Sequence, residues 1–222
     1  MKKFLHNKEN IILLYLTIIT GIYPVFITHD RLMKILNISS FIAVISHYLL
    51  VFFFFFVLPA IIIKFVFKEK LKEYGFNFKN FNKGIKFIII VLPILVALIW
   101  FSSFQKEFQT EYPLSKEVIG VLHKFVIIEI VYLFYYIGWE FLFRGFVLFG
   151  LEKKLGLWLA IMIQTIPSTL LHYTKPSGEI ILSLIAGFVL GYYVLKYRSV
   201  SFAIIIHWIA GIMMDSFVIL HL

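Results

Sequence analysis

Four side chains inside apolar stretches of the sequence are of the types that carry out hydrolysis. Glu140 and Arg144 are four residues apart, and His172 and His207 follow in two separate stretches. Each ionisable side chain at bilayer depth costs at least about 2.5 to 3.5 kcal/mol, so each one needs a partner or a function. A carboxylate can act as a general base, an imidazole or a metal ion can orient a water molecule, and a guanidinium can hold the carboxylate in its charged form. Together these residue types favour hydrolysis by an activated water molecule.

Each of these residues also has a purely structural explanation. Glu140 and Arg144 lie on one face of a helix and can simply neutralise each other, and a lone histidine often only forms a hydrogen bond. Depth argues for a shared site. At a rise of about 1.5 Å per residue, we expect Arg144 and His207 about 12 Å below the inner membrane surface and Glu140 about 18 Å below it. His172 follows at about 24 to 27 Å, so neighbouring helices would bring all four into one layer.

The elements that carry these residues must be membrane-spanning helices. The chain has 222 residues, of which 61% are hydrophobic and only 15% are charged, so an ordinary soluble fold is excluded. Its formal net charge of +9 comes from basic residues that lie between apolar runs, so we expect the lipid bilayer as its surroundings and no nucleic-acid partner. The absence of cysteine excludes disulfides, thiolate metal sites and a cysteine nucleophile.

Seven apolar runs of roughly 20 residues predict an all-α, polytopic integral membrane protein with about seven transmembrane helices. The runs cover residues 10–28, 38–63, 84–104, 125–150, 155–172, 180–195 and 200–220. The four chemistry-bearing residues fall on the fourth, fifth and seventh helices, where we expect a buried polar site. We divide the chain into an N-terminal region, residues 1–117, with three helices and a basic cytoplasmic loop, and a core, residues 118–222.

The distribution of basic residues predicts the orientation of the chain. Fifteen Lys and Arg residues fall in the connections on one side of the predicted spans, and six fall on the other side. Short loops rich in Lys and Arg tend to stay in the cytoplasm. We therefore expect a multi-pass protein of the cell membrane with a cytoplasmic N-terminus and a C-terminus outside.

The region from about residue 128 to residue 215 resembles the CPBP family of intramembrane proteases, which includes CAAX prenyl proteases and bacteriocin-processing or Abi proteins. The first motif of that family is a Glu-Glu pair followed after three residues by Arg. Here Glu140 and Arg144 match the second Glu and the Arg, and Trp139 stands in place of the first Glu.

The second and third motifs of that family each end or begin with a histidine that this sequence keeps. The second motif is Phe followed after three residues by His, and it appears as His172 with Ser168 in place of the Phe. The third motif is His followed after three residues by Asn, and it appears as His207 with Gly211 in place of the Asn. In the family, the first Glu is the usual candidate for activating water, and the Asn is thought to help to hold the oxyanion.

The resemblance implies a membrane-embedded endopeptidase that acts on a membrane-embedded or lipidated peptide. Members of the family cleave the tripeptide after a prenylated cysteine, and bacterial relatives are linked to bacteriocin maturation or self-immunity. We predict that Glu140 and His172 activate the water, that Arg144 pairs with the carboxylate, and that His207 stabilises the oxyanion. The alternative is a degenerate family member that confers bacteriocin immunity or acts as a membrane scaffold, because the first Glu and the Asn are replaced.

A metal ion and two further carboxylates are left open by the sequence. Glu140, His172 and His207 would suit Zn²⁺ with a free position for water, and a metal-free carboxylate and histidine mechanism is an equal alternative. Asp215 follows His207 on one helical stripe and could orient its imidazole. Glu179 could face the site or simply begin a helix, where the helix dipole favours a carboxylate. The oligomeric state is equally open.

Overall fold

The computed structural model describes residues 7–78 and 80–222, and these residues form helices, turns and loops but no strand. The prediction of an all-α, polytopic membrane protein is confirmed. Six helical stretches of the described chain are long and apolar enough to cross a membrane. These stretches are Lys8–Ile27, Ser40–Val66, Phe81–Ser102, Leu122–Leu155, Ser177–Tyr197 and Ser201–His221.

Several of these stretches join an α-helix to a π-helical segment. The long α-helices are α2 (Lys8–Ile22), α4 (Ser40–Phe52), α6 (Phe81–Ser102), α8 (Leu122–Glu140), α10 (Leu157–Leu170), α11 (Ser177–Tyr197) and α12 (Ser201–His221). The shorter ones are α3 (His29–Leu36), α5 (Leu58–Ile61), α7 (Lys106–Glu111) and α9 (Leu148–Leu155). π-Helical segments cover Tyr23–Ile27, Phe53–Val57, Ile62–Val66 and Phe141–Val147, and 3₁₀ turns cover Leu71–Tyr74 and Lys116–Val118.

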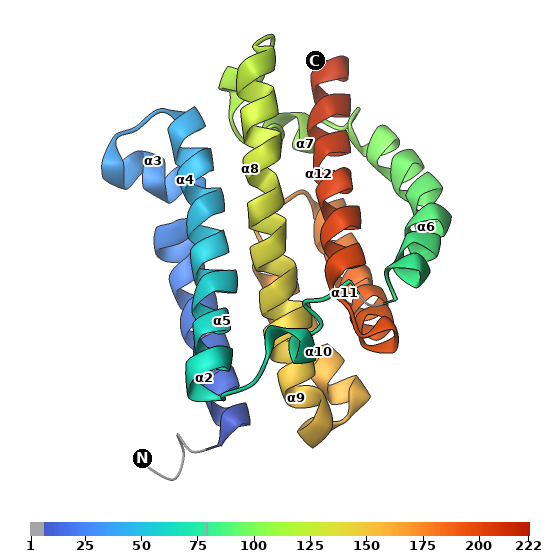
Figure 1. Cartoon of the computed structure of the whole chain (residues 1–222). Coiled ribbons are helices and arrows are strands. Elements are labelled where there is room, and N and C mark those ends of the chain that lie inside the picture. Colours follow the sequence, from blue (N-terminus) through green and yellow to red (C-terminus); the bar gives the residue numbers. More distant parts are fainter. Residues whose placement is uncertain (1–6, 79) are drawn as a thin grey trace.

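The predicted span at residues 155–172 is shorter in the structure than the sequence suggested. α10 has 14 residues, and a helix of that length rises about 21 Å, less than the roughly 30 Å of a hydrocarbon core. Residues 171–175 form turns instead of a last helical turn. In Figure 1, α2 begins at one end of the bundle and α12 ends at the other. α10 is counted among the shorter apolar helices and is not one of the six stretches long enough to cross a membrane.

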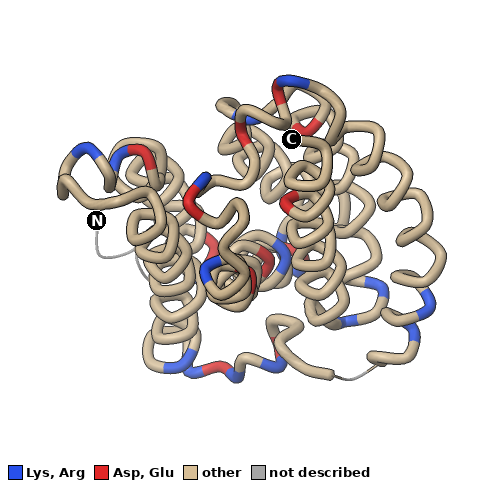
Figure 2. Tube along the Cα trace, turned by 90° about the horizontal axis from the view of Figure 1, so that it is seen from above, with Lys and Arg blue, Asp and Glu red and all other residues tan. Residues whose placement is uncertain are grey.

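α8 is the central helix of the bundle. It packs against α4 on one side and α12 on the other, α12 in turn packs against α6, and α10 packs against α11. The close approach of α4 requires Gly138, because a Cβ at this position would lie 2.9 Å from the backbone oxygen of Val51. The view along the bundle shows charged residues at its centre as well as at its rim (Figure 2).

Ion pairs tie the connections together at both ends of the bundle. Lys8 pairs with Glu69 at 2.6 Å near the N-terminal end, and Lys175 pairs with Glu111 at 2.7 Å near the other. Lys124 Nζ lies 2.9 Å from Glu117 Oε2. The side chain of Glu129, five residues after Lys124, instead turns into the bundle, where only 6% of the residue is exposed.

The orientation of the chain in the membrane stays a prediction. Lys2, Lys3 and Lys79, which contribute to the basic side, lie outside the described residues. α3 and α7, which belong to the predicted outer side, lie towards the end of the bundle that holds the C-terminus (Figure 1). The predicted inner side contains α9 and the loop before α6.

Single cysteines can test this orientation, because the chain has no native cysteine. Lys106 at the start of α7 and Lys154 in α9 are both exposed, and they lie on opposite predicted sides. We expect a membrane-impermeant maleimide to label Lys106→Cys in intact cells and to label Lys154→Cys only after the membrane is opened. The opposite pattern would place the C-terminus in the cytoplasm.

Candidate active site

Glu140, the last residue of α8, accepts two hydrogen bonds at one carboxylate oxygen. Its Oε1 lies 3.2 Å from Arg144 Nη1 and 2.7 Å from His207 Nδ1. Arg144 is in the π-helical segment that follows α8, and His207 is on α12. Glu140 is 0% exposed and Arg144 is 2% exposed. Three of the four predicted residues are thus in direct contact inside the bundle.

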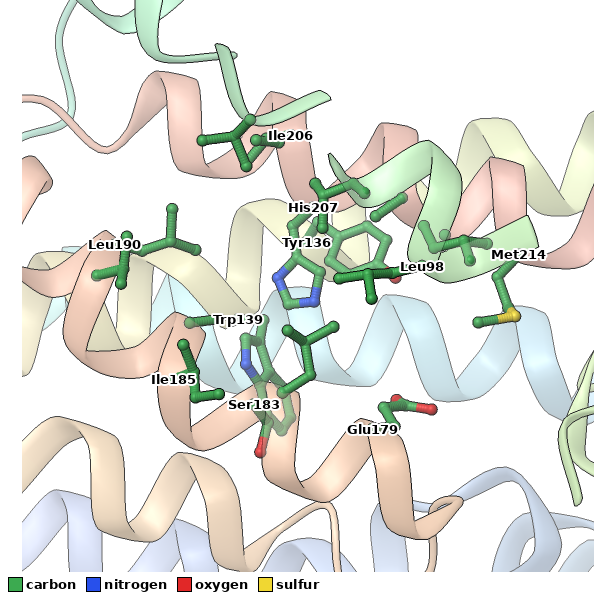
Figure 3. A pocket seen from close by; sticks show the side chains of 18 of the residues that line it. Leu98, Tyr136, Trp139, Glu179, Ser183, Ile185, Leu190, Ile206, His207 and Met214 are labelled. Atoms are coloured by element: carbon green, nitrogen blue, oxygen red, sulfur yellow. The ribbon is translucent and has the colours of Figure 1, made fainter. Parts of the chain in front are cut away.

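The bond to Glu140 fixes which nitrogen of His207 carries the proton. A carboxylate can only accept, so Nδ1 of His207 donates, and in the neutral ring Nε2 then carries a free lone pair. His207 lines two cavities of the protein. Figure 3 shows its ring projecting into the first of these cavities beside Tyr136. A carboxylate that holds one nitrogen and leaves the other facing a cavity is the arrangement of a histidine base.

His172 lies in the turn after α10 and faces the same two cavities. Its Nδ1 donates to the backbone oxygen of Ser168 at 2.8 Å, so its Nε2 is also the nitrogen left for other contacts. Trp139 packs against it edge to face, with ring centroids 5.3 Å apart. His172 is therefore positioned by its own helix and by an indole ring.

Two cavities of different character meet at this point. The first has a volume of about 320 Å³ and is lined mainly by apolar side chains of α6, α11 and α12. The second has a volume of about 360 Å³, is lined by many polar side chains, and extends to α3 and the turn after α10. The residues that line both are Tyr112, Tyr132, Tyr136, Trp139, His172, Glu179 and His207. Glu140 lines neither of these two cavities and lies behind His207.

Hydrogen bonds and an ion pair connect the polar side chains that line the second cavity. The Tyr112 hydroxyl donates to the two carboxylate oxygens of Glu179 at 2.7 and 2.9 Å. Lys175 donates to Glu111 at 2.7 Å. Burial disfavours the charge of Lys175, but the carboxylates of Glu179 and Glu111 outweigh burial and raise the pKa of Lys175 above its usual value. Glu179 lies in the first turn of α11 and also faces the cavities, so the two interpretations of this residue are compatible.

The structure replaces the expected role of Asp215. We expected Asp215 to orient the imidazole of His207, but Glu140 holds that ring. Asp215 is 2% exposed, and its carboxyl group interacts with that of Glu129 on α8. The spacing on α12 placed Asp215 on the same stripe as His207, but Asp215 is two helical turns away from His207. Glu140 on the neighbouring helix α8 is in direct contact with the imidazole.

Trp139 stands at the position of the first Glu in the family motif, and its indole ring cannot accept a proton as a carboxylate does. Its ring is 2% exposed and packs between Phe55, at 5.7 Å between centroids, and Phe143, at 5.1 Å. Its indole also borders both cavities. This residue therefore supports the wall of the site and positions His172.

Tyr136 lies against His207 and was not predicted as a site residue from the sequence. The two ring centroids are 4.4 Å apart. Its hydroxyl oxygen would be 2.6 Å from a Cβ built on Gly211. The signal was present in the sequence, because Tyr136 precedes Glu140 by four residues and so shares its helical face.

The comparisons with known proteins agree with the resemblance read from the motifs. Residues 120–213, less than half of the chain, match the family described as type II CAAX prenyl endopeptidase Rce1-like. The matched segment contains Glu140, Arg144, His172 and His207. No curated protein and no solved structure matches the chain. The predicted family likeness is confirmed for this segment, and the roles of the individual residues stay predictions.

The side chains at the site do not form a full set of metal ligands. Within residues 7–78 and 80–222, no group of three or more His, Asp or Glu is arranged to hold a metal ion. His172 and His207 each leave Nε2 free, but Glu140 is turned to His207 and Arg144 and does not face the cavities. A catalytic zinc site normally needs three protein ligands. The predicted third ligand is therefore not in place.

Arg144 should be needed for stability, because it pairs with a buried carboxylate. We expect Arg144→Met to lower the free energy of unfolding by about 3 to 5 kcal/mol, since a buried Glu140 loses its permanent counter-charge. Unfolding in mixed detergent micelles measures the change. The matched control is Arg198→Met, which breaks a pair with Glu152 in which the arginine side chain is 46% exposed and should cost at most about 1 kcal/mol. Equal losses in the two variants would contradict a buried ion pair.

Proposed function

We propose that this chain is an intramembrane endopeptidase that resembles CAAX prenyl proteases and hydrolyses a peptide bond with an activated water molecule. The observation that carries the proposal is the placement of His207. Its Nδ1 is held by the buried carboxylate of Glu140 at 2.7 Å, and its ring lines the cavities where an apolar and a polar space meet.

In this proposal His207 is the general base. Its Nε2 takes a proton from water while the water oxygen adds to the carbonyl carbon of the peptide bond, and the tetrahedral intermediate forms. The protonated imidazole then gives its proton to the leaving nitrogen as the carbon–nitrogen bond breaks. Glu140 stays ionised and stabilises the imidazolium.

The proposal changes the division of roles suggested by the sequence. We expected Glu140 to take the proton and His207 to hold the oxyanion, but Glu140 is 0% exposed and lies behind His207. Arg144 keeps the expected role, because its guanidinium bonds the same carboxylate oxygen. His172 faces the cavities with a free Nε2, which suits it to accept a hydrogen bond from the second O–H of the attacking water and so to orient it.

The two cavities suit a substrate with an apolar and a polar part. The apolar cavity lies between α6 and α11, where aliphatic side chains such as Val91, Leu95 and Val189 line it. A lipid chain or a hydrophobic helix would lose little by moving there from the bilayer. The polar cavity offers Lys175 and tyrosine hydroxyls to a peptide backbone. A membrane-embedded or lipidated peptide fits this pair of spaces.

We propose that the reaction is metal-free. Two imidazoles without a third facing ligand hold zinc weakly, and the proposed steps need only the side chains of this chain. Cleavage by purified protein should therefore change by no more than about two-fold after 1,10-phenanthroline treatment. Metal analysis of the same preparation should find zinc well below one ion per chain. Loss of activity that zinc alone restores would show that the site is a metal centre.

The replacement of two motif residues favours one alternative function. Trp139 and Gly211 stand where the family has a carboxylate and an amide, so a degenerate member that binds a bacteriocin or another membrane protein is the second candidate. Such a protein would need the fold and the cavities but no proton transfer. The two functions therefore differ in their dependence on the charge of Glu140.

Glu140→Gln separates catalysis from binding. Gln can still accept both bonds at Oε1 but cannot stabilise the imidazolium, so turnover should fall by at least about a thousand-fold. Turnover is compared per folded molecule, with the folded fraction taken from unfolding in micelles, because Arg144 loses its counter-charge in this variant. The probe is an internally quenched peptide with an S-prenyl cysteine three residues from its C-terminus, in liposomes. Glu129→Gln is the matched control, because Glu129 is also a buried carboxyl group of α8 but lines neither cavity. Full turnover in the Glu140→Gln variant would refute the role of Glu140 in hydrolysis. Full protection of cells against a bacteriocin by this variant, with no cleavage by the native protein, would favour the binding function.

A further inference from the structure

α8 and α12 place two pairs of residues in register. Tyr136 and Glu140 are one turn apart on α8, and Gly211 and His207 are one turn apart on α12. The two helices pack against each other. Glu140 bonds His207 at 2.7 Å, and one turn away the Tyr136 hydroxyl lies against Gly211. The two contacts form consecutive rungs between the same helices.

The second rung leaves no room for a side chain on α12. A Cβ built on Gly211 would lie 2.6 Å from the Tyr136 hydroxyl oxygen and 2.8 Å from Cε1 of Tyr132. Real Cβ atoms essentially never come this close to another heavy atom. The phenol of Tyr136 therefore fills the space in which any side chain at position 211 would begin.

The hydroxyl in this space is placed to serve the reaction proposed above, and the inference rests on that proposed function. Addition of water to a peptide carbonyl creates a negative oxygen that needs a hydrogen-bond donor. The ring of Tyr136 lies 4.4 Å from the ring of His207, centroid to centroid, and Tyr136 borders both cavities. A donor here would lie next to the base that starts the reaction.

Most other donors that border both cavities are already engaged. Tyr112 donates to Glu179, and Nδ1 of His172 donates to a backbone oxygen. Nδ1 of His207 donates to Glu140, and the indole N–H of Trp139 is buried away from the cavity surface. The two remaining hydroxyls of this set are those of Tyr132 and Tyr136. The Tyr136 oxygen accepts a hydrogen bond from Tyr132 and its own proton is left to donate, and only the ring of Tyr136 contacts the ring of His207.

We propose that the phenolic hydroxyl of Tyr136 donates the hydrogen bond that stabilises the oxyanion, and that Gly211 is the residue that makes room for it. The tyrosine on α8 thus takes the place that the related family gives to the Asn side chain on the helix of the second histidine. Tyr136 and Gly211 form one functional unit, and neither substitution is tolerated alone.

Removal of the hydroxyl tests the proposal directly. Tyr136→Phe keeps the ring contact with His207, so kcat for the S-prenyl peptide in liposomes should fall by about 10² to 10³-fold with KM nearly unchanged. The affinity for a phosphinic peptide that imitates the tetrahedral intermediate should fall by a similar factor. Tyr193→Phe is the matched control, because Tyr193 is a half-buried tyrosine of α11 that lines neither cavity, and its kcat should stay within about three-fold of the native value. A kcat for Tyr136→Phe equal to that of the control would overturn the role of Tyr136.

Exchange of the two residues tests the shared position. Gly211→Asn alone should fail to fold or to cleave, because its side chain meets the phenol. Tyr136→Ala together with Gly211→Asn should cleave at least about ten-fold faster than Tyr136→Ala, since the amide then reaches the same space. A folded double variant with no gain over Tyr136→Ala would contradict a shared position. Unfolding temperatures in micelles identify the folded variants.

Glu140→Gln distinguishes a failure of this inference from a failure of the proposed function. If the native protein and Glu140→Gln cleave equally slowly, hydrolysis itself is wrong, and the role of Tyr136 falls with it. If the native protein cleaves, Glu140→Gln does not, and Tyr136→Phe is unaffected, only the role of Tyr136 is wrong.

Discussion

The contact between Glu140, Arg144 and His207 is the interaction on which the rest of the structure depends. A carboxylate inside a hydrocarbon layer costs several kcal/mol even after the surroundings relax. That cost is offset only while both donors stay within hydrogen-bond distance of the same oxygen, at 3.2 and 2.7 Å. Arg144 comes from the same helical stretch, but His207 comes from α12, so the packing of α12 on α8 is a condition for burying the charge. Fold and site are therefore stabilised by the same contact.

The surroundings of Glu140 show how this condition is met. Gly138 lets α4 approach α8 closely, and Gly211 lets the phenol of Tyr136 approach α12. The π-helical segment Phe141–Val147 begins directly after Glu140 and carries Arg144. π-Helical turns are frequent at functional sites because they shift the side chains that follow. The glycines therefore let α4 and α12 approach α8 near Glu140, and the π-helical turn carries the guanidinium of Arg144 to the same carboxylate.

The sequence predicted the costly residues well and the contacts between helices less well. Glu140, Arg144, His172 and His207 stand out because any ionisable group in an apolar run needs a reason. Spacing along one helix then gave the pair of Glu140 and Arg144 correctly. The partners that cross between helices could not be derived from spacing.

Two errors and one omission illustrate this limit. Asp215 was assigned to His207 on its own helical stripe, whereas the structure gives His207 to Glu140 on α8. The length of α10 was overestimated for a related reason, since an apolar run does not show where the helix ends before a turn. Tyr136 was overlooked because an aromatic residue in an apolar helix is ordinary. Only the structure shows that this tyrosine lies against Gly211 of another helix.

The replaced motif residues need not remove the chemistry, because the reaction requires a proton acceptor and a donor at the cavity and not particular residue types. The acceptor that faces the cavities is the imidazole of His207, which Glu140 supports from behind, so a carboxylate at position 139 is not required for it. Trp139 can then serve packing, and its edge-to-face contact with His172 holds a second imidazole at the same wall. Trp139 adds bulk to α8, and Gly211 leaves space on α12. Both features are consistent with a proposed site in which α8 supplies more of the functional side chains than α12.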